Sequence, residues 1–130
     1  MKPNSNFISI LIFGLLGCIP KITLSLINQQ LALSLEESVA LLDVYHHLPE
    51  GDNTLVGQIR FQDSGFSTDC NFNSLLNRAR QEARRHGANI VKIIEKRAPD
   101  LISTCYRLKI ELYKYNGEVS DLKQYELNLD

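Results

Sequence analysis

Three cysteines, each in a different setting, constrain this chain more than any other feature. Cys18 ends an apolar run, Cys70 lies in a turn before a basic segment, and Cys105 begins a stretch of alternating polarity. A chain of 130 residues forms one small domain, in which a single covalent bridge supplies a large share of the stability. The chemical state of these sulfurs therefore bears on both the fold and the compartment in which it is stable.

The first 17 residues have the pattern of an export signal. A polar start with the single cation Lys2 precedes a mainly apolar run at 7–16. Such a run suits the hydrophobic region of a signal peptide and is too short to span a bilayer. We expect residues 1–17 to be a signal peptide. An uncleaved membrane anchor is the alternative, because apolar residues resume at 22–35.

The sequence Leu15-Leu16-Gly17-Cys18, at the end of this run, resembles a bacterial lipobox. The resemblance implies that a peptidase cleaves before Cys18 and that fatty chains are attached to its thiol, which makes Cys18 the lipidation site. Several acyl chains exceed the single chain that gives only marginal membrane binding. Ordinary signal cleavage after Ser34 is the alternative, with a longer and more polar leader.

The rest of the chain predicts one α+β domain over residues 38–130, joined to Cys18 by a tether at 18–37 whose leucines suit either a strand or a helix. The helix packs on a mainly antiparallel sheet in the order β-β-α-β-β. A further short edge strand near Tyr125 is possible. The polarity patterns place strands at 39–47, 54–62, 89–96 and 103–115 and a helix at 71–86.

Local residues mark the ends of the predicted helix and one irregular strand position. Asp69, Asn71 and Asn73 are candidate N-caps, and Gly87 suits a left-handed C-cap. Gly57, inside a predicted strand, indicates a bulge or a close approach of backbone.

Once Cys18 is acylated, Cys70 and Cys105 remain as an even pair in an oxidising compartment. A disulfide between them would close a loop of 36 residues, worth about 4 kcal/mol in the chain-entropy model. Strand alternation puts Cys105 on the face away from the helix unless the strand begins with a bulge.

Two other states of the pair stay open at this point. Cys70 near a helix N-terminus would be a reactive thiol if it were free. Both cysteines could also join histidines around zinc, although no short paired ligand spacing is present. The histidines are His46, His47 and His86.

Positive charge is concentrated in the middle of the chain. Residues 60–114 carry 11 basic and six acidic side chains, whereas the remainder of the mature chain is acidic. Arg78, Arg84, Arg85 and Lys92 are the candidates for binding an anionic surface, such as phosphate-bearing lipid or glycan. A solvated helix face, with its charges mixed by Glu82 and Glu95, is the favoured interpretation of the same charges. Nucleic acid is not expected as a partner outside the cytoplasm.

No catalytic constellation can be argued from the spacing of the polar residues. The chain has no Ser-His-Asp ordering, no glycine-rich phosphate loop and no paired acids at a predicted cleft. We therefore expect no enzyme activity, no cofactor and no metal.

A set of short motifs between residues 55 and 113 has a known counterpart. The motifs are Gly57-Gln-Ile, Asp63-Ser-Gly-Phe-Ser-Thr-Asp-Cys70, Ala79 and Ala83 followed by Gly87-Ala-Asn, and Ser103-Thr-Cys-Tyr-Arg107. Together they resemble the RcsF-like outer-membrane lipoproteins and the YbjQ-like envelope domains. In the RcsF-like pattern, a cysteine before the helix pairs with one in a Cys-Tyr-Arg segment, which implies a Cys70–Cys105 disulfide. The second disulfide and the Pro-rich tether of that family have no counterpart here.

These observations together predict a lipoprotein of the bacterial envelope. We expect a lipid anchor in the outer membrane, on its periplasmic or outer surface, and another envelope protein as partner. The expected role is that of a non-enzymatic binding or stress-sensing module. The alternative is an oligomeric domain that binds a small ligand or a metal.

Overall fold

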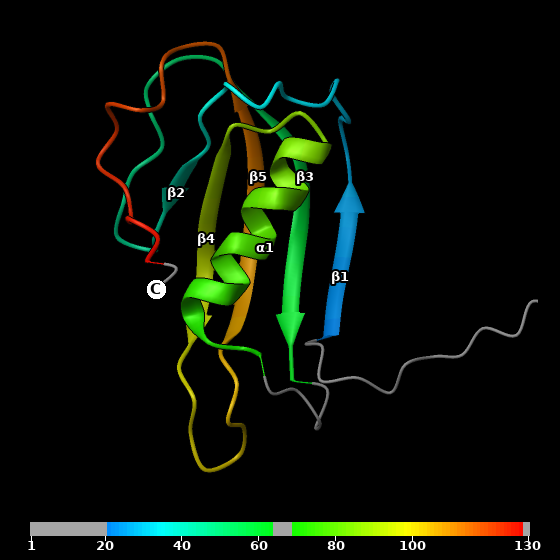
Figure 1. The fold of residues 1–130 in the computed structure, drawn as a ribbon, viewed down its shortest axis with the longest axis vertical. Helices are drawn as coiled ribbons and strands as arrows, with labels where there is room; N and C mark the ends of the chain where they lie inside the picture. The colour runs from blue at the N-terminus through cyan, green and yellow to red at the C-terminus, as the bar shows by residue number, and fades with distance from the viewer. Residues whose placement is uncertain (1–20, 64–68, 129–130) are drawn as a thin grey trace, which may run out of the picture.

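The structure, a computed structural model, describes residues 21–63 and 69–128 (Figure 1). In chain order its elements are β1 (Lys21–Leu26), β2 (Ala40–Leu42), β3 (Asn53–Gln62), α1 (Phe72–Arg85), β4 (Ile90–Arg97) and β5 (Arg107–Tyr115). The strands form one sheet in the order β1-β3-β5-β4-β2, antiparallel except for the parallel pair β2 and β4. Helix α1 lies across one face of this sheet (Figure 1). The predicted α+β class, one helix on a mainly antiparallel sheet, is confirmed.

Helix α1 begins and ends where local groups satisfy its free backbone atoms. The Asn71 side chain accepts a hydrogen bond from the backbone of Ser74 at 2.9 Å. At the other end Gly87 has a φ of +79°, and the Ala88 amide donates to the Ala83 carbonyl at 2.8 Å. This is the Schellman arrangement, which satisfies the last carbonyls of a helix. The expected N-cap at Asn71 and C-cap at Gly87 are confirmed.

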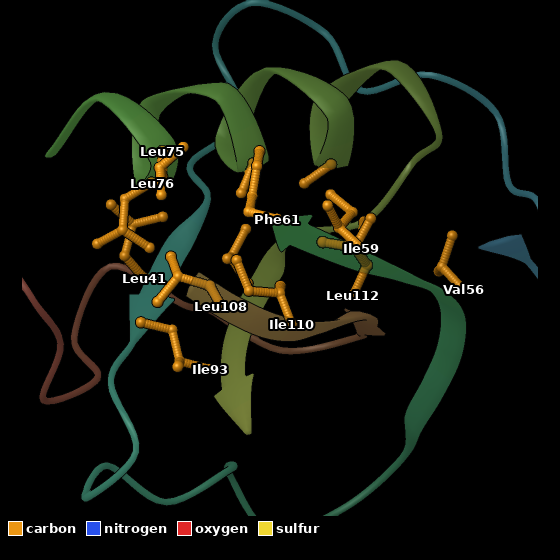
Figure 2. Close-up of a cluster of buried hydrophobic side chains, with 14 residues drawn as sticks. Leu41, Val56, Ile59, Phe61, Leu75, Leu76, Ile93, Leu108, Ile110 and Leu112 are labelled. Atoms are coloured by element: carbon orange, nitrogen blue, oxygen red, sulfur yellow. The ribbon is translucent and has the colours of Figure 1, made fainter. Parts of the chain in front are cut away.

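The main core lies between α1 and the three central strands (Figure 2). Leu75, Leu76, Ala79 and Ala83 of the helix are all buried. The facing strand residues are Ile59, Phe61, Val91, Ile93, Leu108, Ile110 and Leu112. Because side chains alternate along a strand, the residues between these point to the opposite face of the sheet.

The opposite face of the sheet is covered only in part. Ala40, Leu42 and Ile90 form a second buried cluster there with Val119, from the turn after β5. The side chains of β1, β3 and the lower half of β5 on this face are polar and solvent-accessible. We call this uncovered part the open face.

Part of the segment interpreted as a tether belongs to the sheet. Residues 21–26 form β1, which pairs antiparallel with β3 along its whole length. Ile22 and Leu24 pack against the main core, so their alternation is that of a half-buried strand. Since β1 covers the outer edge of β3, the β-β-α-β-β order gains a strand at its N-terminal end.

The first predicted strand is shorter than 39–47, because the chain turns after Leu42. The Asp43 side chain accepts from the Val44 amide at 2.7 Å, and the His46 amide donates to the Asp43 carbonyl at 3.0 Å. The described tail at 116–128 contains no strand. It is held instead by the Tyr125 amide, which donates to the Leu41 carbonyl at 2.7 Å.

Gly57 marks both a bulge and a close approach, as its position in the sequence indicated. The register of β3 against β5 shifts between Leu55 and Gly57, which turns Val56 into the core. A Cβ atom at Gly57 would lie 2.6 Å from the Ser25 carbonyl oxygen of β1. Only glycine therefore allows β1 to pair at this position.

We predict that Gly57→Ala lowers the free energy of unfolding by about 1–3 kcal/mol, because the new methyl group forces β1 away from β3. Urea denaturation measures the loss, and hydrogen exchange locates it at the β1 amides. Thr54→Ala, at an exposed position of the same strand, is the control and should change stability by less than about 0.5 kcal/mol. Equal stability and exchange in Gly57→Ala and wild type would contradict the pairing.

Candidate functional site

A buried disulfide joins the segment before α1 to the loop between β4 and β5. Cys70 and Cys105 are bonded, with their Cα atoms 5.1 Å apart. Their exposed fractions are 6% and 0%, so solvent reaches neither sulfur readily. The predicted pairing is confirmed, which removes the free-thiol and zinc alternatives for both residues.

The buried position of Cys105 follows from where β5 begins. The strand starts at Arg107 rather than at 103, so Cys105 precedes the strand and its alternation does not apply. The Tyr106 amide donates to the Cys70 carbonyl at 3.2 Å, beside the bridge. Hydrogen bonds around Ser103 add to this support, since its hydroxyl donates to the Asp63 carboxylate and accepts from the Cys105 amide.

The β4–β5 loop, residues 98–106, is organised around the Asp100 carboxylate. One carboxylate oxygen accepts from the amides of Ile102 and Ser103, each at 2.9 Å. The other accepts from the Arg107 guanidinium at 2.8 Å, and the same guanidinium group donates to the Ala98 carbonyl at 3.3 Å. Arg107 therefore connects the start of β5 to the β4 side of the loop.

These contacts hold Asp100 in its ionised form. The hydrogen bond from Arg107, followed by those from the Ser103 and Ile102 amides, lowers the pKa of the carboxyl group to about 2. A carboxylate that accepts several hydrogen bonds is stabilised in its charged state. The Asp100 carboxylate therefore keeps its hydrogen bonds to the loop at any pH near neutrality.

The braced loop holds two large apolar side chains in solvent. Leu101 is fully exposed and Ile102 is 89% exposed. The loop projects past the lower end of the sheet, beyond the end of β4 (Figure 1). The backbone before and after these two residues is fixed. Their side chains therefore stay exposed and do not fold back onto the core.

Next to this loop, the open face carries closely spaced positive charges. Arg60 of β3 is directly opposite Lys109 of β5, and Arg97 of β4 is directly opposite Arg107. Like charges at directly opposed positions of antiparallel strands destabilise a sheet. Lys21 of β1 lies at the same end, opposite Gln62. We call Lys21, Arg60, Arg97, Arg107 and Lys109 the basic end of the sheet.

The basic end is only partly neutralised within the molecule. Arg107 is paired with Asp100, and Glu95 lies opposite Lys109. Over residues 21–63 and 69–128, Arg60, Arg97 and Lys109 form no ion pair. A shallow depression runs between these side chains, and Gln62 and Glu95 also line it. Guanidinium and ammonium groups that lie on neighbouring strands, as these do, can bind phosphate or carboxylate groups.

The helix arginines named from the sequence lie elsewhere, on α1. Arg78 and Arg85 are 3.7 and 3.1 Å from the same carboxylate oxygen of Glu82, a buried acid. Arg84 donates to the Ser34 carbonyl at 3.2 Å. The charges of Arg78 and Arg85 are thus shared with Glu82, and the Arg84 side chain fastens the segment that crosses the end of the helix.

Lys92, the fourth candidate, lies on the other face of the sheet and is occupied. Its ammonium group donates to the carbonyls of Asp43, Val44 and His46 at 2.7, 3.2 and 2.6 Å. Burial lowers the pKa of Lys92, against the opposing effect of the nearby Asp43. The structure therefore does not bring Lys92 together with the three arginines.

His46 and His86 each contact an acidic residue of the fold. The His46 ring accepts from the Asp43 amide at 2.9 Å, and His86 lies 3.5 Å from Glu82. Among the residues placed by the structure, no group of three or more His, Cys, Asp or Glu side chains could hold a metal ion. The prediction for Cys18 and the signal peptide at 1–17 lies outside the described residues.

Sequence reasoning missed Arg60, Arg107, Lys109 and the apolar pair Leu101-Ile102 as functional candidates. The alternation of Arg60 and Lys109 with buried residues was visible, but their juxtaposition depends on the register of two strands. The remaining signal in the sequence was the adjacent leucine and isoleucine in a loop that basic residues flank.

Comparison of the chain with protein-family models, curated proteins and solved structures finds no match. Within the described ranges, no helix has both the length and the apolar character needed to cross a membrane.

We predict that replacing both bridge cysteines, as in C70A/C105A, lowers the free energy of unfolding by about 4 kcal/mol, because the unfolded chain gains the freedom of a large loop. Denaturant unfolding measures the difference. Reductant should destabilise the wild type and leave the double variant unchanged. Two titratable thiols at positions 70 and 105 in the unreduced, denatured protein would contradict the bridge.

We predict that Arg107→Gln raises the pKa of Asp100 from about 2 toward its ordinary value of 3.8, because it removes the main hydrogen bond to the carboxylate. NMR titration of the Asp100 carboxyl group measures this. In the wild type, the ionised carboxylate stabilises the loop above pH 3.8, and this contribution is lost as the pH falls toward 2. An unchanged pKa in Arg107→Gln would show that the pair does not organise the loop.

Proposed function

We propose that this protein is a lipoprotein of the bacterial envelope, acylated at Cys18, which acts as a non-enzymatic binding module with an anionic partner. The arrangement of the basic end supports this proposal best. Two like-charged pairs, Arg60 with Lys109 and Arg97 with Arg107, are directly opposed on one uncovered face. A sheet that keeps such pairs gains stability when an anionic surface covers them.

The disulfide supports the same proposal, because it keeps the binding end rigid. Cys105 fixes the base of the β4–β5 loop to the segment before α1, and Asp100 fixes the rest of the loop. A preorganised surface loses less conformational entropy on binding than a mobile one. A reductant reaches this buried bridge only when the lower end of the domain opens. Cleavage of the bridge would then free the loop from the helix, which is how the module would also act as a sensor.

The apolar run before Cys18 and the lipobox resemblance support the location. A lipid anchor places the domain next to a membrane, where its partner is an envelope protein or the membrane surface.

We predict that the mature protein purified from bacterial membranes has the mass of residues 18–130 plus the acyl chains of a lipoprotein. Intact-protein mass spectrometry, followed by fragmentation at the N-terminus, measures this. Cys18→Ala is the matched variant and should accumulate as the uncleaved precursor. A mature chain that begins at another residue, without lipid, would overturn the lipoprotein proposal.

Crosslinking in intact cells then tests the binding proposal. Crosslinks should concentrate at the open face and fall in R60Q/K109Q, but persist in R78Q/R85Q, which removes the same charge from the helix. Crosslinks only between copies of this chain, or a stoichiometric bound metal, would favour the oligomeric ligand-binding alternative instead.

A further inference from the structure

The lipid attachment site lies close to the basic end along the chain. Strand β1 begins at Lys21, three residues after Cys18. Three extended residues span at most about 10 Å. An acylated Cys18 would therefore hold the start of β1 within that distance of the membrane surface.

The start of β1 and the β4–β5 loop lie at the same end of the sheet. Lys21 pairs with Gln62 at the end of β3, and Arg97 pairs with Arg107 where the loop leaves β4 and returns to β5 (Figure 1). Neighbouring strands are about 4.8 Å apart, so β1 and β5 are separated by about 10 Å. The anchor thus brings this end of the domain to the membrane, and not the end near residues 27–38.

The composition of this end suits a membrane surface that carries negative charge. Leu101 and Ile102 are exposed in the middle of the loop, and the basic end lies on the open face beside its base. Apolar side chains enter the boundary between headgroups and acyl chains, while Lys and Arg bind anionic headgroups. Buried anchors of the loop, Cys105 and Ser103, keep this part of it in its extended position.

We infer that the β4–β5 loop is a membrane-docking element. It inserts Leu101 and Ile102 into the headgroup region of an anionic bilayer, while Arg60, Arg97, Arg107 and Lys109 bind lipid phosphates. The inference rests on the proposed function for the position of the anchor, and it names the bilayer as the anionic partner. The acyl chains keep the protein at the membrane, and the loop fixes its orientation.

The chain contains no tryptophan, so a single introduced tryptophan reports on one position without background. L101W places the probe in the middle of the loop. L35W is the matched control, because Leu35 is 94% exposed but lies in the segment that crosses the opposite end of the molecule (Figure 1). Both full-length variants are purified in acylated form and reconstituted into vesicles of phosphatidylcholine alone or with phosphatidylglycerol.

The inference predicts a blue shift of L101W emission, and quenching by brominated acyl chains, in vesicles that contain phosphatidylglycerol. L35W emission should not change. In an L101W/R60Q/K109Q variant, the equilibrium constant for loop insertion should fall by about fivefold for each charge removed. High salt should lower the insertion constant of L101W by a similar factor, because it screens the same charges. Unchanged thermal unfolding of each variant shows that the fold is intact.

Three results would overturn the inference. These are L101W emission that ignores vesicles of either composition, a larger response from L35W, or an equal response in phosphatidylcholine and in anionic vesicles. An emission change that needs an added envelope protein, rather than lipid, would identify the loop as a protein-binding element instead. The mass of the mature chain tests acylation separately, so a missing anchor and a loop that fails to insert are distinguishable.

Discussion

The disulfide between Cys70 and Cys105 is the constraint on which the lower end of the molecule depends. It connects the entrance of the only helix in the described ranges to a loop that has no regular structure of its own. With that loop fixed, Asp100 and Arg107 can pair across it, and the apolar tip stays in solvent. The register of β4 against β5 places Arg97 opposite Arg107, and the bridge holds the loop that joins these two residues.

Much of the fold could be predicted because its signals are local. The helix carries its own caps at Asn71 and Gly87, and the alternation of β5 needs no partner to be recognised. Strand β1 could not be assigned, because a short alternating segment becomes a strand only where β3 offers a free edge with Gly57 at the close approach. The parallel pairing of β2 with β4 likewise joins segments that are far apart in the sequence.

The candidate site was less predictable, because it depends on register and on irregular positions. A shift in β4 between Ile93 and Glu95 turns Lys96 toward the helix, where it lies 4.2 Å from the centre of the Phe72 ring. Charge counting along the chain pointed to the helix, where Arg78 and Arg85 instead share Glu82. The paired cysteines were predictable from their number and setting. The set of cations that the fold brings together could not be predicted, because only the pairing of β3 with β5 places Arg60 opposite Lys109.

The orientation of the oxidised, acylated protein on an anionic bilayer tests the central claim most directly. It can be measured by NMR, from the broadening of backbone amide signals by a paramagnetic ion chelated to lipid headgroups. The account predicts the strongest broadening at residues 98–104 and near Lys21, with little effect at 27–35. It also predicts that reduction of the bridge weakens the pattern in the loop. Strongest broadening at 27–35, or uniform broadening over the surface, would contradict it.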